Sequence, residues 1–495
     1  MTHLRRATGL LTATLLAVTL FTVTGAAPAE ADIYSDGGGC SVSRPMAQKA
    51  VARQTRAKKK LRRAKKKLRR AKRRDDGVAK ARKVVRKKRK KLKQARRKRR
   101  AAVALRRELC SSSLTRVSVG YRGQGNGTSW DAEISANDRF VVFASEASNL
   151  VPGDTNGVAD VFVRDLVLRR TTRVSVPSGG GQATARSAHP TISADGRIVA
   201  FVSTAPNLVP GVGNGRNQAF VHDRATGRTT HVSPSIGGGA SNGQSLQPSL
   251  SANGRHVVYR SSATDLVAPR VPATYQVYAF DRAAGTNRVV STTPTGLRGN
   301  GPTVNPRISG DGRFVSYITQ ATNYVTGRGG AEDPMVFQWA RSTGRSTIVS
   351  VDNTGAALTA PVSAPTTSAD GRYVLFAQQR RTASGTVASD VLQRRDRLGT
   401  TGHHVRTVGD RYATQPWLSP DGGWAGWTAG VRGVLEEIST GIRIDLLRGN
   451  PVTAAERPRE ISVSTLARAA TFTSTSPGLV RGDTNQVADI FVRRR

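Results

Sequence analysis

Lysine is absent from most of this chain. Every lysine lies between Lys49 and Lys98, and the rest of the sequence carries its positive charge on arginine alone. Acidic residues are also few, 33 against 77 lysines and arginines, which gives a formal net charge of +44. This uneven distribution indicates that two physically different parts are joined near Cys110.

Metal-binding clusters and catalytic motifs are also scarce. Of the seven histidines only His403 and His404 are adjacent, and no H-E-x-x-H or Cys/His cluster supports a zinc enzyme. The one match to G-x-S-x-G, Gly239 to Gly243, falls in a predicted loop between repeats, where a nucleophile needs a strand-to-helix turn. The sequence therefore predicts no catalytic set, although paired carboxylates of a glycosidase would not be visible at this level.

The first residues have the order of a secretory signal. Arg5 and Arg6 precede an apolar run from Leu10 to Val23, and the small residues of AAPAEAD follow. This order predicts a signal peptide over residues 1–31, cleaved after Ala29 or Ala31, with a transmembrane anchor as the alternative. Residues 32–43 are then a linker. No later apolar run approaches the roughly 20 residues of a membrane span, so we expect a secreted or envelope-associated protein.

Residues 44–109 form a strongly basic segment. It contains 34 lysines and arginines against three acidic residues, a formal charge of +31. Small or apolar residues follow steps of three and four positions with polar interruptions at Gln54, Lys88 and Arg99, which is the spacing of a coiled-coil seam. They are Ala47, Ala50, Ala57, Leu61, Ala64, Leu68, Ala71, Val78, Ala81, Val85, Leu92, Ala95, Ala102 and Leu109. Asp75, Asp76 and Gly77 suit a turn, so we predict an α-helical hairpin, with a disordered basic tail as the alternative.

The two cysteines of the chain flank this segment. If the arms fold back at Gly77, Cys40 and Cys110 meet at the base of the hairpin, and an exported protein favours a disulfide there. Closing a loop of about 70 residues would contribute on the order of 4 kcal/mol. This contribution would offset the repulsion between like charges along the helices.

The charge of the hairpin predicts a polyanionic partner. The residues that we expect to carry this binding are Lys58, Lys59, Lys60, Arg62, Arg63, Lys65, Lys66, Lys67, Arg86, Lys87, Lys88, Arg89, Lys90 and Lys91. Such side chains bind phosphate without sequence preference. No aromatic residue interrupts the charges, so base stacking on nucleic acid is not indicated. Anionic cell-wall polymers, anionic lipid head groups and extracellular nucleic acid are the candidates, and a solvated spacer is the alternative.

A cassette of short predicted strands repeats over residues 114–495. Aligned on the serine of S-x-D-G-R, its seven copies begin at Ser135, Ser193, Ser251, Ser309, Ser368, Ser419 and Ser464. Each copy reads as four strands with tight Asp-Gly and Thr-Gly turns, which predicts an all-β propeller. The last copy lacks its fourth strand, and a spare strand, Leu114 to Val119, precedes the first. We therefore expect seven four-stranded blades closed by both chain ends, with six as the alternative.

The repeat resembles a known family. The segments ISADGRIVAFVS and FVHDRATGRTTHVS, from Ile192 onward, are similar to the TolB-type, WD-repeat-like propeller repeat of exported bacterial proteins, and the resemblance covers Leu114 to Arg495. It implies a propeller fold. It leaves the activity open, because such propellers serve as binding platforms, as scaffolds and as gates on hydrolases.

Two loops share a polar pattern that suits a hard cation. Oxygen ligands at alternating positions favour calcium, although Asx turns that shape the loops explain the pattern equally well. The residues are Asp154, Asn156 and Asp160 in one loop and Asp483, Asn485 and Asp489 in the other. No other cofactor is predicted. The repeated arginines Arg197, Arg255, Arg313 and Arg372 are expected to pair with blade aspartates such as Asp223 and Asp281.

Strand order places the long loops of the propeller on one face, where binding usually resides. We therefore predict an exported, non-enzymatic binding or scaffold protein whose loop face binds a protein or a glycan, and whose hairpin attaches to anionic cell-envelope polymers. One alternative is a propeller hydrolase or lyase that acts on carbohydrate or peptide through carboxylates in its central channel. The other is binding of extracellular nucleic acid by the hairpin alone.

Overall fold

The computed structural model describes two parts of the chain. The first comprises residues 44–74, 78–79 and 82–93. The second runs from 113 to 494 without 122, 272, 326–333, 353–354, 359–361, 363, 382–386, 397–402, 409–415, 430–431, 440–441, 448–455, 457 and 481–482. The predicted signal peptide, the linker and both cysteines lie outside these residues, so the expected Cys40–Cys110 disulfide stays a prediction.

The strands of the second part form seven four-stranded antiparallel sheets, one for each cassette, which we number I to VII. Sheet I contains β4 (Ser129–Ile134), β5 (Phe140–Ser145), β6 (Asp160–Asp165) and β7 (Arg170–Arg173). Sheet II contains β8 (Ser187–Ile192), β9 (Ile198–Ser203), β10 (Gln218–Asp223) and β11 (Arg228–His231). Sheet III contains β12 (Ser245–Leu250), β13 (His256–Ser261), β14 (Gln276–Asp281) and β15 (Thr286–Val289).

The remaining sheets repeat this plan. Sheet IV contains β16 (Thr303–Ile308), β17 (Phe314–Thr319), β18 (Met335–Ala340) and β19 (Arg345–Ile348). Sheet V contains β20 (Thr366–Thr367), β21 (Tyr373–Arg381), β22 (Val387–Asp396) and β23 (His403–Val408). Sheet VI contains β24 (Trp417–Leu418), β25 (Trp424–Ala429), β26 (Arg432–Glu437) and β27 (Ile442–Asp445). Sheets V and VI therefore have first strands of only two residues.

Sheet VII is built from both ends of the propeller. It combines β28 (Arg459–Val463), β29 (Ala469–Ser474) and β30 (Asp489–Arg494) with β1 (Ser113–Arg116), which pairs antiparallel with β30. The expected closure by the spare strand is thus present. A two-stranded ribbon, β2 (Val119–Gly120) and β3 (Gly123–Gln124), follows β1, and two short 3₁₀ helices, η1 (Thr322–Tyr324) and η2 (Thr465–Ala467), complete the elements.

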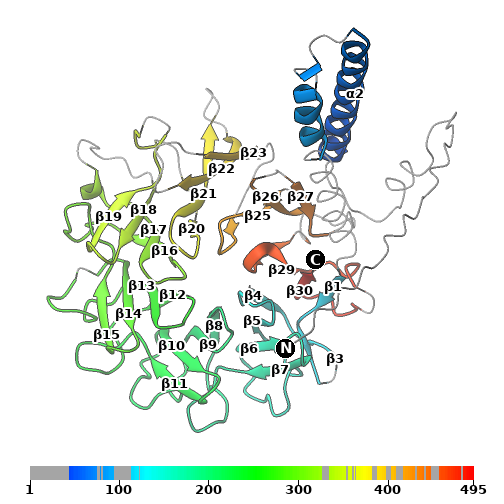
Figure 1. The fold of residues 1–495 in the computed structure, drawn as a ribbon. Helices are drawn as coiled ribbons and strands as arrows, with labels where there is room; N and C mark the ends of the chain where they lie inside the picture. Colours follow the sequence, from blue (N-terminus) through cyan, green and yellow to red (C-terminus); the bar gives the residue numbers. More distant parts are fainter. Residues whose placement is uncertain are drawn as a thin grey trace, which may run out of the picture. The chain divides into compact units, whose positions relative to one another are not determined.

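The sheets follow one another around a ring (Figure 1). The first strand of each sheet contacts the first strand of the next, from β4 through β8, β12, β16, β20, β24 and β28 back to β4. Backbone bonds tie successive turns together, since the N–H of Ala194 donates to Ala252 O at 2.9 Å and that of Ala252 donates to Gly310 O at 2.8 Å. This arrangement is a β-propeller with four-stranded blades.

The cassette serine shapes the first hairpin of each blade. Ser193 donates its hydroxyl to Oδ1 of Asp195 at 2.6 Å and accepts the N–H of Ile198 at 2.9 Å, while Asp195 accepts the N–H of Arg197 at 3.0 Å. Gly196 follows at a φ of +77°, which a glycine adopts without strain. The S-x-D-G-R motif therefore forms its turn from its own side chains and backbone.

The repeated arginines pair largely as expected. Arg197 lies 2.7 Å from Asp223, Arg255 lies 3.0 Å from Asp281, and Arg372 lies 2.8 Å from Asp396. Arg313 instead pairs with Asp311 of its own turn at 2.6 Å, because sheet IV has Ala340 at the position of these acids. The pairs made by Arg197, Arg255 and Arg372 therefore connect the first hairpin of a blade to the second hairpin at the same end.

Aromatic pairs occupy the same register in most sheets. The second and third strands place Phe143 opposite Phe162, with ring centroids 5.9 Å apart, and Phe201 opposite Phe220 at 6.0 Å. The equivalent pairs are Tyr259 with Tyr278, Tyr317 with Phe337 and Phe472 with Phe491. All of these side chains are buried, so sheets I to IV and sheet VII each contribute one aromatic layer to the core.

The basic segment is helical where the structure describes it. Helix α2 spans Arg44–Arg74, and residues 82–93 are also helical. Every described side chain that is not exposed lies at a seam position or at one of its polar interruptions. Those positions are Gln54, Ala57, Leu61, Ala64, Leu68, Ala71, Val78, Val85, Lys88 and Leu92. The described side chains therefore follow the predicted heptad face, whereas a coiled coil and pairing of the two helices as a hairpin stay predictions.

Candidate functional site

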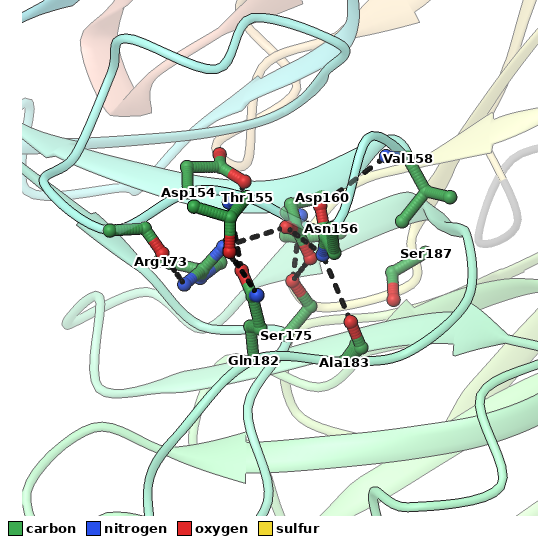
Figure 2. Close-up of polar contacts among 12 residues, drawn as sticks. Asp154, Thr155, Asn156, Val158, Asp160, Arg173, Ser175, Gln182, Ala183 and Ser187 are labelled. Carbon is green, nitrogen blue, oxygen red and sulfur yellow. Dashed lines mark hydrogen bonds and ion pairs between the residues drawn. The ribbon is translucent and has the colours of Figure 1, made fainter.

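The first predicted calcium loop surrounds an arginine (Figure 2). Nη1 of Arg173, on β7, lies 3.0 Å from Oδ1 of Asp154 and 3.0 Å from Oδ2 of Asp160. Asn156 donates to that same Oδ2 at 2.9 Å, and Ser175 donates to the other oxygen of Asp160 at 2.5 Å. The three predicted residues do come together. The position between the carboxylates is held by a guanidinium.

This loop also contacts the next long loop. Asn156 donates to the carbonyl of Ala183 at 2.9 Å, and Gln182 donates to Thr155 Oγ1 at 2.8 Å (Figure 2). The loop between β5 and β6 therefore contacts the loop between β7 and β8, which connects sheet I to sheet II. Strand order predicted that these two kinds of loop share one face of the propeller.

The second predicted calcium loop repeats this design. Nη1 of Arg116, on β1, lies 3.6 Å from Oδ1 of Asp483 and 3.5 Å from Oδ2 of Asp489. Asn485 donates to Gly125 O at 2.7 Å, and Ser118 donates to Oδ1 of Asp489. Burial raises the pKa of Asp489 to about 6 even with these partners.

These contacts do not suit a calcium ion. Calcium takes six to eight oxygen ligands, whereas each loop offers two carboxylates that already face an arginine, and Asn156 presents its amide nitrogen to Asp160. Among the described residues there is no group of three or more His, Cys, Asp or Glu side chains able to hold a metal ion. The contacts at both loops therefore favour an arginine over a calcium ion.

Sheet II has a neutral version of the same arrangement. Gln218 replaces Asp160 and His231 replaces Arg173, and His231 Nε2 lies 3.2 Å from Oε1 of Gln218. Burial lowers the pKa of His231 to about 4, so this histidine is uncharged at neutral pH. The acid and the base of sheet I are thus both replaced by neutral side chains in sheet II, and the contact between the two positions is kept. This indicates that the contact holds the loops in place.

The predicted polyanion-binding side chains lie on the outside of the helices. Twelve of the fourteen are exposed; Lys88 is partly buried, and the side chain of Lys67 lies outside the described part. The exposed residues are Lys58, Lys59, Lys60, Arg62, Arg63, Lys65, Lys66, Arg86, Lys87, Arg89, Lys90 and Lys91. The buried seam therefore leaves the remaining faces of both helices positively charged.

A polar ring on the first strands was not predicted from the sequence. Asp131, His189, Gln247, Asn305 and Glu460 each stand four residues before a cassette serine, and each has a φ between 51° and 54°. A left-handed conformation at a non-glycine residue costs on the order of 1 kcal/mol or more and clusters at sites where the structure requires it. Each of these residues lies in a register shift of its strand.

Members of this ring join neighbouring blades. The side-chain amide of Gln247 donates to Asn305 Oδ1 at 2.7 Å, and its Oε1 atom accepts the backbone N–H of Asn305 at 3.2 Å. Glu460 accepts the N–H of Asp131 at 2.5 Å, and Asp131 Oδ2 lies 2.9 Å from Nδ1 of His189. A chain of three titratable residues therefore crosses from sheet VII through sheet I to sheet II.

The acidic end of this chain is electrostatically unfavourable. Burial raises the pKa of Glu460, and the nearby charge of Asp131 raises it further. Glu133, two residues after Asp131, also has its pKa raised by burial, although the positive charge of Arg307 opposes the shift. The sequence signal was present in the constant spacing of four residues before the serine. It was missed because the residue types differ from copy to copy.

No family model and no curated protein matches the sequence. Solved structures with a similar fold include an oligogalacturonate lyase in complex with manganese, 12% identical, with 77% of this chain and 93% of that chain covered at a TM-score of 0.52. The β-propeller domain of the Trilobed protease from Pyrococcus furiosus is 11% identical, with 74% and 93% covered and a TM-score of 0.45. A putative TolB from Agrobacterium tumefaciens is 13% identical, with 57% and 81% covered and a TM-score of 0.36.

These likenesses concern the fold alone. The assignment as an all-β propeller rests on the sheets and contacts described above, and the similarity to TolB-type repeats remains a resemblance drawn from the sequence. Among the described helices, none combines the length and the apolar character that crossing a membrane requires.

Proposed function

We propose that this chain is an exported, non-enzymatic binding protein that attaches to anionic polymers through its basic helices. The observation that carries the proposal is the division of the helices into one buried seam and exposed lysines and arginines on the other faces. A face organised in this way keeps its shape while presenting charge, whereas an unordered basic tail has no such division.

The charge density favours phosphate-rich polymers. Helix α2 has 31 residues, about 46 Å at 1.5 Å per residue. Each phosphate that a lysine or arginine neutralises releases a counterion, so affinity falls steeply with salt. The absence of aromatic residues from the segment supports a partner recognised by charge, such as an anionic cell-envelope polymer, in preference to a base sequence.

The propeller is then the part that meets a protein or glycan partner. Its long loops between the second and third strands and between sheets contact one another, as Thr155 and Gln182 do. Arg173 and Arg116 fasten the acidic loops from within. Rigid loops on a closed scaffold are suited to binding with little ordering cost.

The attachment is tested with the full-length chain on immobilised polyphosphate. We compare the wild type with a variant in which the fourteen predicted residues become glutamine, and with a matched variant in which the eight exposed and one partly buried lysines among them become arginine. The glutamine variant should lose retention, and the arginine variant should keep it. Retention of the wild type that persists unchanged in 1 M NaCl would contradict the proposal, because counterion release would then not drive binding. Competition between DNA and teichoic acid separates the two polymer classes.

One observation favours a second function, an enzyme of the hydrolase or lyase type. Glu460 and Asp131 are adjacent carboxylates on the first strands, and the pKa of Glu460 is raised, as a general acid requires. The fold does not decide between the two, since a lyase shares it. Turnover of carbohydrate or peptide substrates that disappears in Glu460→Gln and Asp131→Asn, but not in Glu146→Gln, would displace the first proposal.

A further inference from the structure

A cavity lies beside the seam where the propeller closes. Its volume is about 650 Å³, within the range of small-molecule sites. Its lining residues belong to β1, to the β2–β3 ribbon, to sheet I, to the segment before β30 and to the end of β30. Its apolar side chains are Leu114, Val119, Leu166, Val480 and Val492.

The charged lining of this cavity has one sign. It contains Arg116, Arg164, Arg169 and Arg494 and no acidic residue. Arg116 faces Asp483 and Asp489, so its charge is balanced. Arg164 donates to the carbonyl of Val119 at 3.2 Å and to Thr171 Oγ1 at 3.0 Å, which are neutral partners. Burial and the positive charge of Arg169 lower the pKa of Arg164.

Arg494 distinguishes sheet VII, where the propeller closes, from sheets I to III. It ends the third strand of sheet VII opposite Ala469, as Asp165 ends the third strand of sheet I opposite Phe140. The same position holds Asp223 in sheet II and Asp281 in sheet III. One blade therefore carries an arginine where these others carry an aspartate. Its Nη2 donates to the backbone carbonyl of Asp138 at 3.0 Å, which is again a neutral partner.

From this geometry we propose that the cavity is a binding site for a small anionic amphiphile, a molecule with a phosphate or carboxylate head and a short apolar tail. Arg164, Arg169 and Arg494 receive the head, since guanidinium groups bind both oxyanions through paired N–H donors. Leu114, Val119, Leu166 and Val480 cover the tail. Its described lining includes no residue of the basic helices and none of the polar ring of the first strands.

The test is calorimetric titration of the full-length chain with octyl phosphate below its micelle concentration. A background of 0.5 M NaCl weakens binding by the exposed helices more than binding in a partly buried cavity. We expect one saturable site. Octyl glucoside, which has the tail without the charge, and inorganic phosphate, which has the charge without the tail, should each bind at least about tenfold more weakly. Octanoate distinguishes a carboxylate head from a phosphate head.

Three variants locate the site. Arg164→Gln and Arg494→Asp should each weaken binding of octyl phosphate by about tenfold or more, the loss expected for one charged hydrogen-bonding partner. Arg169→Gln alters an exposed residue, so it keeps the test valid if the other two destabilise the fold. The matched control is Arg228→Gln, which removes an exposed arginine from β11 of the next sheet. Equal affinity in the wild type and all three variants would overturn the proposal, and so would equal binding of octyl glucoside.

Discussion

Arg173 holds its Nη1 atom 3.0 Å from Oδ2 of Asp160, a carboxylate with no exposed surface. Asp154, the second partner of the same nitrogen, is also nearly buried. One buried acid and one largely buried acid thus share a largely buried cation, and the loops that they belong to lie on the long-loop face of the propeller. A buried pair of this kind is costly to break, because the remaining partner keeps its charge out of water.

Replacing Arg173 with methionine should therefore lower the free energy of unfolding by about 3–5 kcal/mol. Urea denaturation followed by circular dichroism measures the change. Arg170→Met, three residues earlier at an exposed position of the same strand, is the matched control and should change stability by less than about 0.5 kcal/mol. Similar small losses in both variants would show that the pair contributes little.

Calcium should leave the wild-type chain unaffected. The guanidinium of Arg173 occupies the position between Asp154 and Asp160, so the oxygens have no room for a second cation. We expect the melting temperature to be the same in excess calcium chloride and in EDTA. A rise with calcium that follows its concentration would indicate binding to the folded state and would contradict this account.

The Asp-Gly turn and the Thr-Gly turn of sheet II offer a paired test of blade packing. Gly196 and Gly227 have nearly the same φ, +77° and +71°, so alanine introduces similar backbone strain at both. A Cβ at Gly196 would lie 2.0 Å from the Phe140 ring of sheet I, whereas one at Gly227 would meet nothing within 4 Å. We expect Gly196→Ala to cost about 1–3 kcal/mol more than Gly227→Ala in chemical denaturation. Equal losses would mean that the neighbouring blade yields freely.

Acid should destabilise the propeller in part through His231. Its pKa falls from the ordinary 6.5 to about 4 on folding, so the unfolded chain binds more protons between these values. Stability from this group is present above pH 6.5 and is lost as the pH falls toward 4, by on the order of 3 kcal/mol. His231→Gln should flatten the stability profile over this range and match the wild type in slope above pH 7. An unchanged profile between pH 4 and 6.5 would refute the assignment.

Glu460 should act in the opposite direction. Its raised pKa means that the folded chain binds the proton more readily than the unfolded chain, so stability declines as the pH rises above the ordinary value of 4.5. Glu460→Gln keeps an oxygen for the N–H of Asp131 and removes the charge. We expect this variant to be more stable than the wild type at pH 8, by on the order of 1 kcal/mol, with the difference shrinking toward pH 4. Glu146→Gln, at an exposed position, controls for loss of one surface charge.

The fold was predictable because short sequence motifs, repeated in most copies, each determine a local structure. Ser193, Asp195 and Gly196 make a turn from their own side chains and backbone, so the motif specifies a hairpin without knowledge of the rest of the chain. Closure was predictable because the last copy lacks its fourth strand and a spare strand precedes the first copy. The two ends of the repeat region can therefore complete one sheet together. The seam of the helices was predictable because Ala64, Val85 and Leu92 follow a fixed period.

The side-chain chemistry was less accessible, since it depends on contacts between copies. Asp154 and Asp160 suit a cation in sequence, and only the fold reveals that the cation is Arg173 from a strand 13 residues beyond Asp160. Asp131, His189 and Glu460 share no residue type, so their common backbone conformation was invisible. The proposed role of Arg494 depends on the fold, which places it in the lining of one cavity with Arg164 and Arg169.

Pairing of β1 with β30 has a consequence for the order in which the molecule is made. Thr115 bonds opposite Val492, so the first strand to leave the ribosome must wait for almost the last residues before its sheet exists. Until then six blades can assemble with an open gap, and Arg116 and Asp489 remain apart. Synthesis that stops short of residue 489 would therefore leave an unclosed ring, with the edges of two blades exposed to proteolysis or to pairing with another chain.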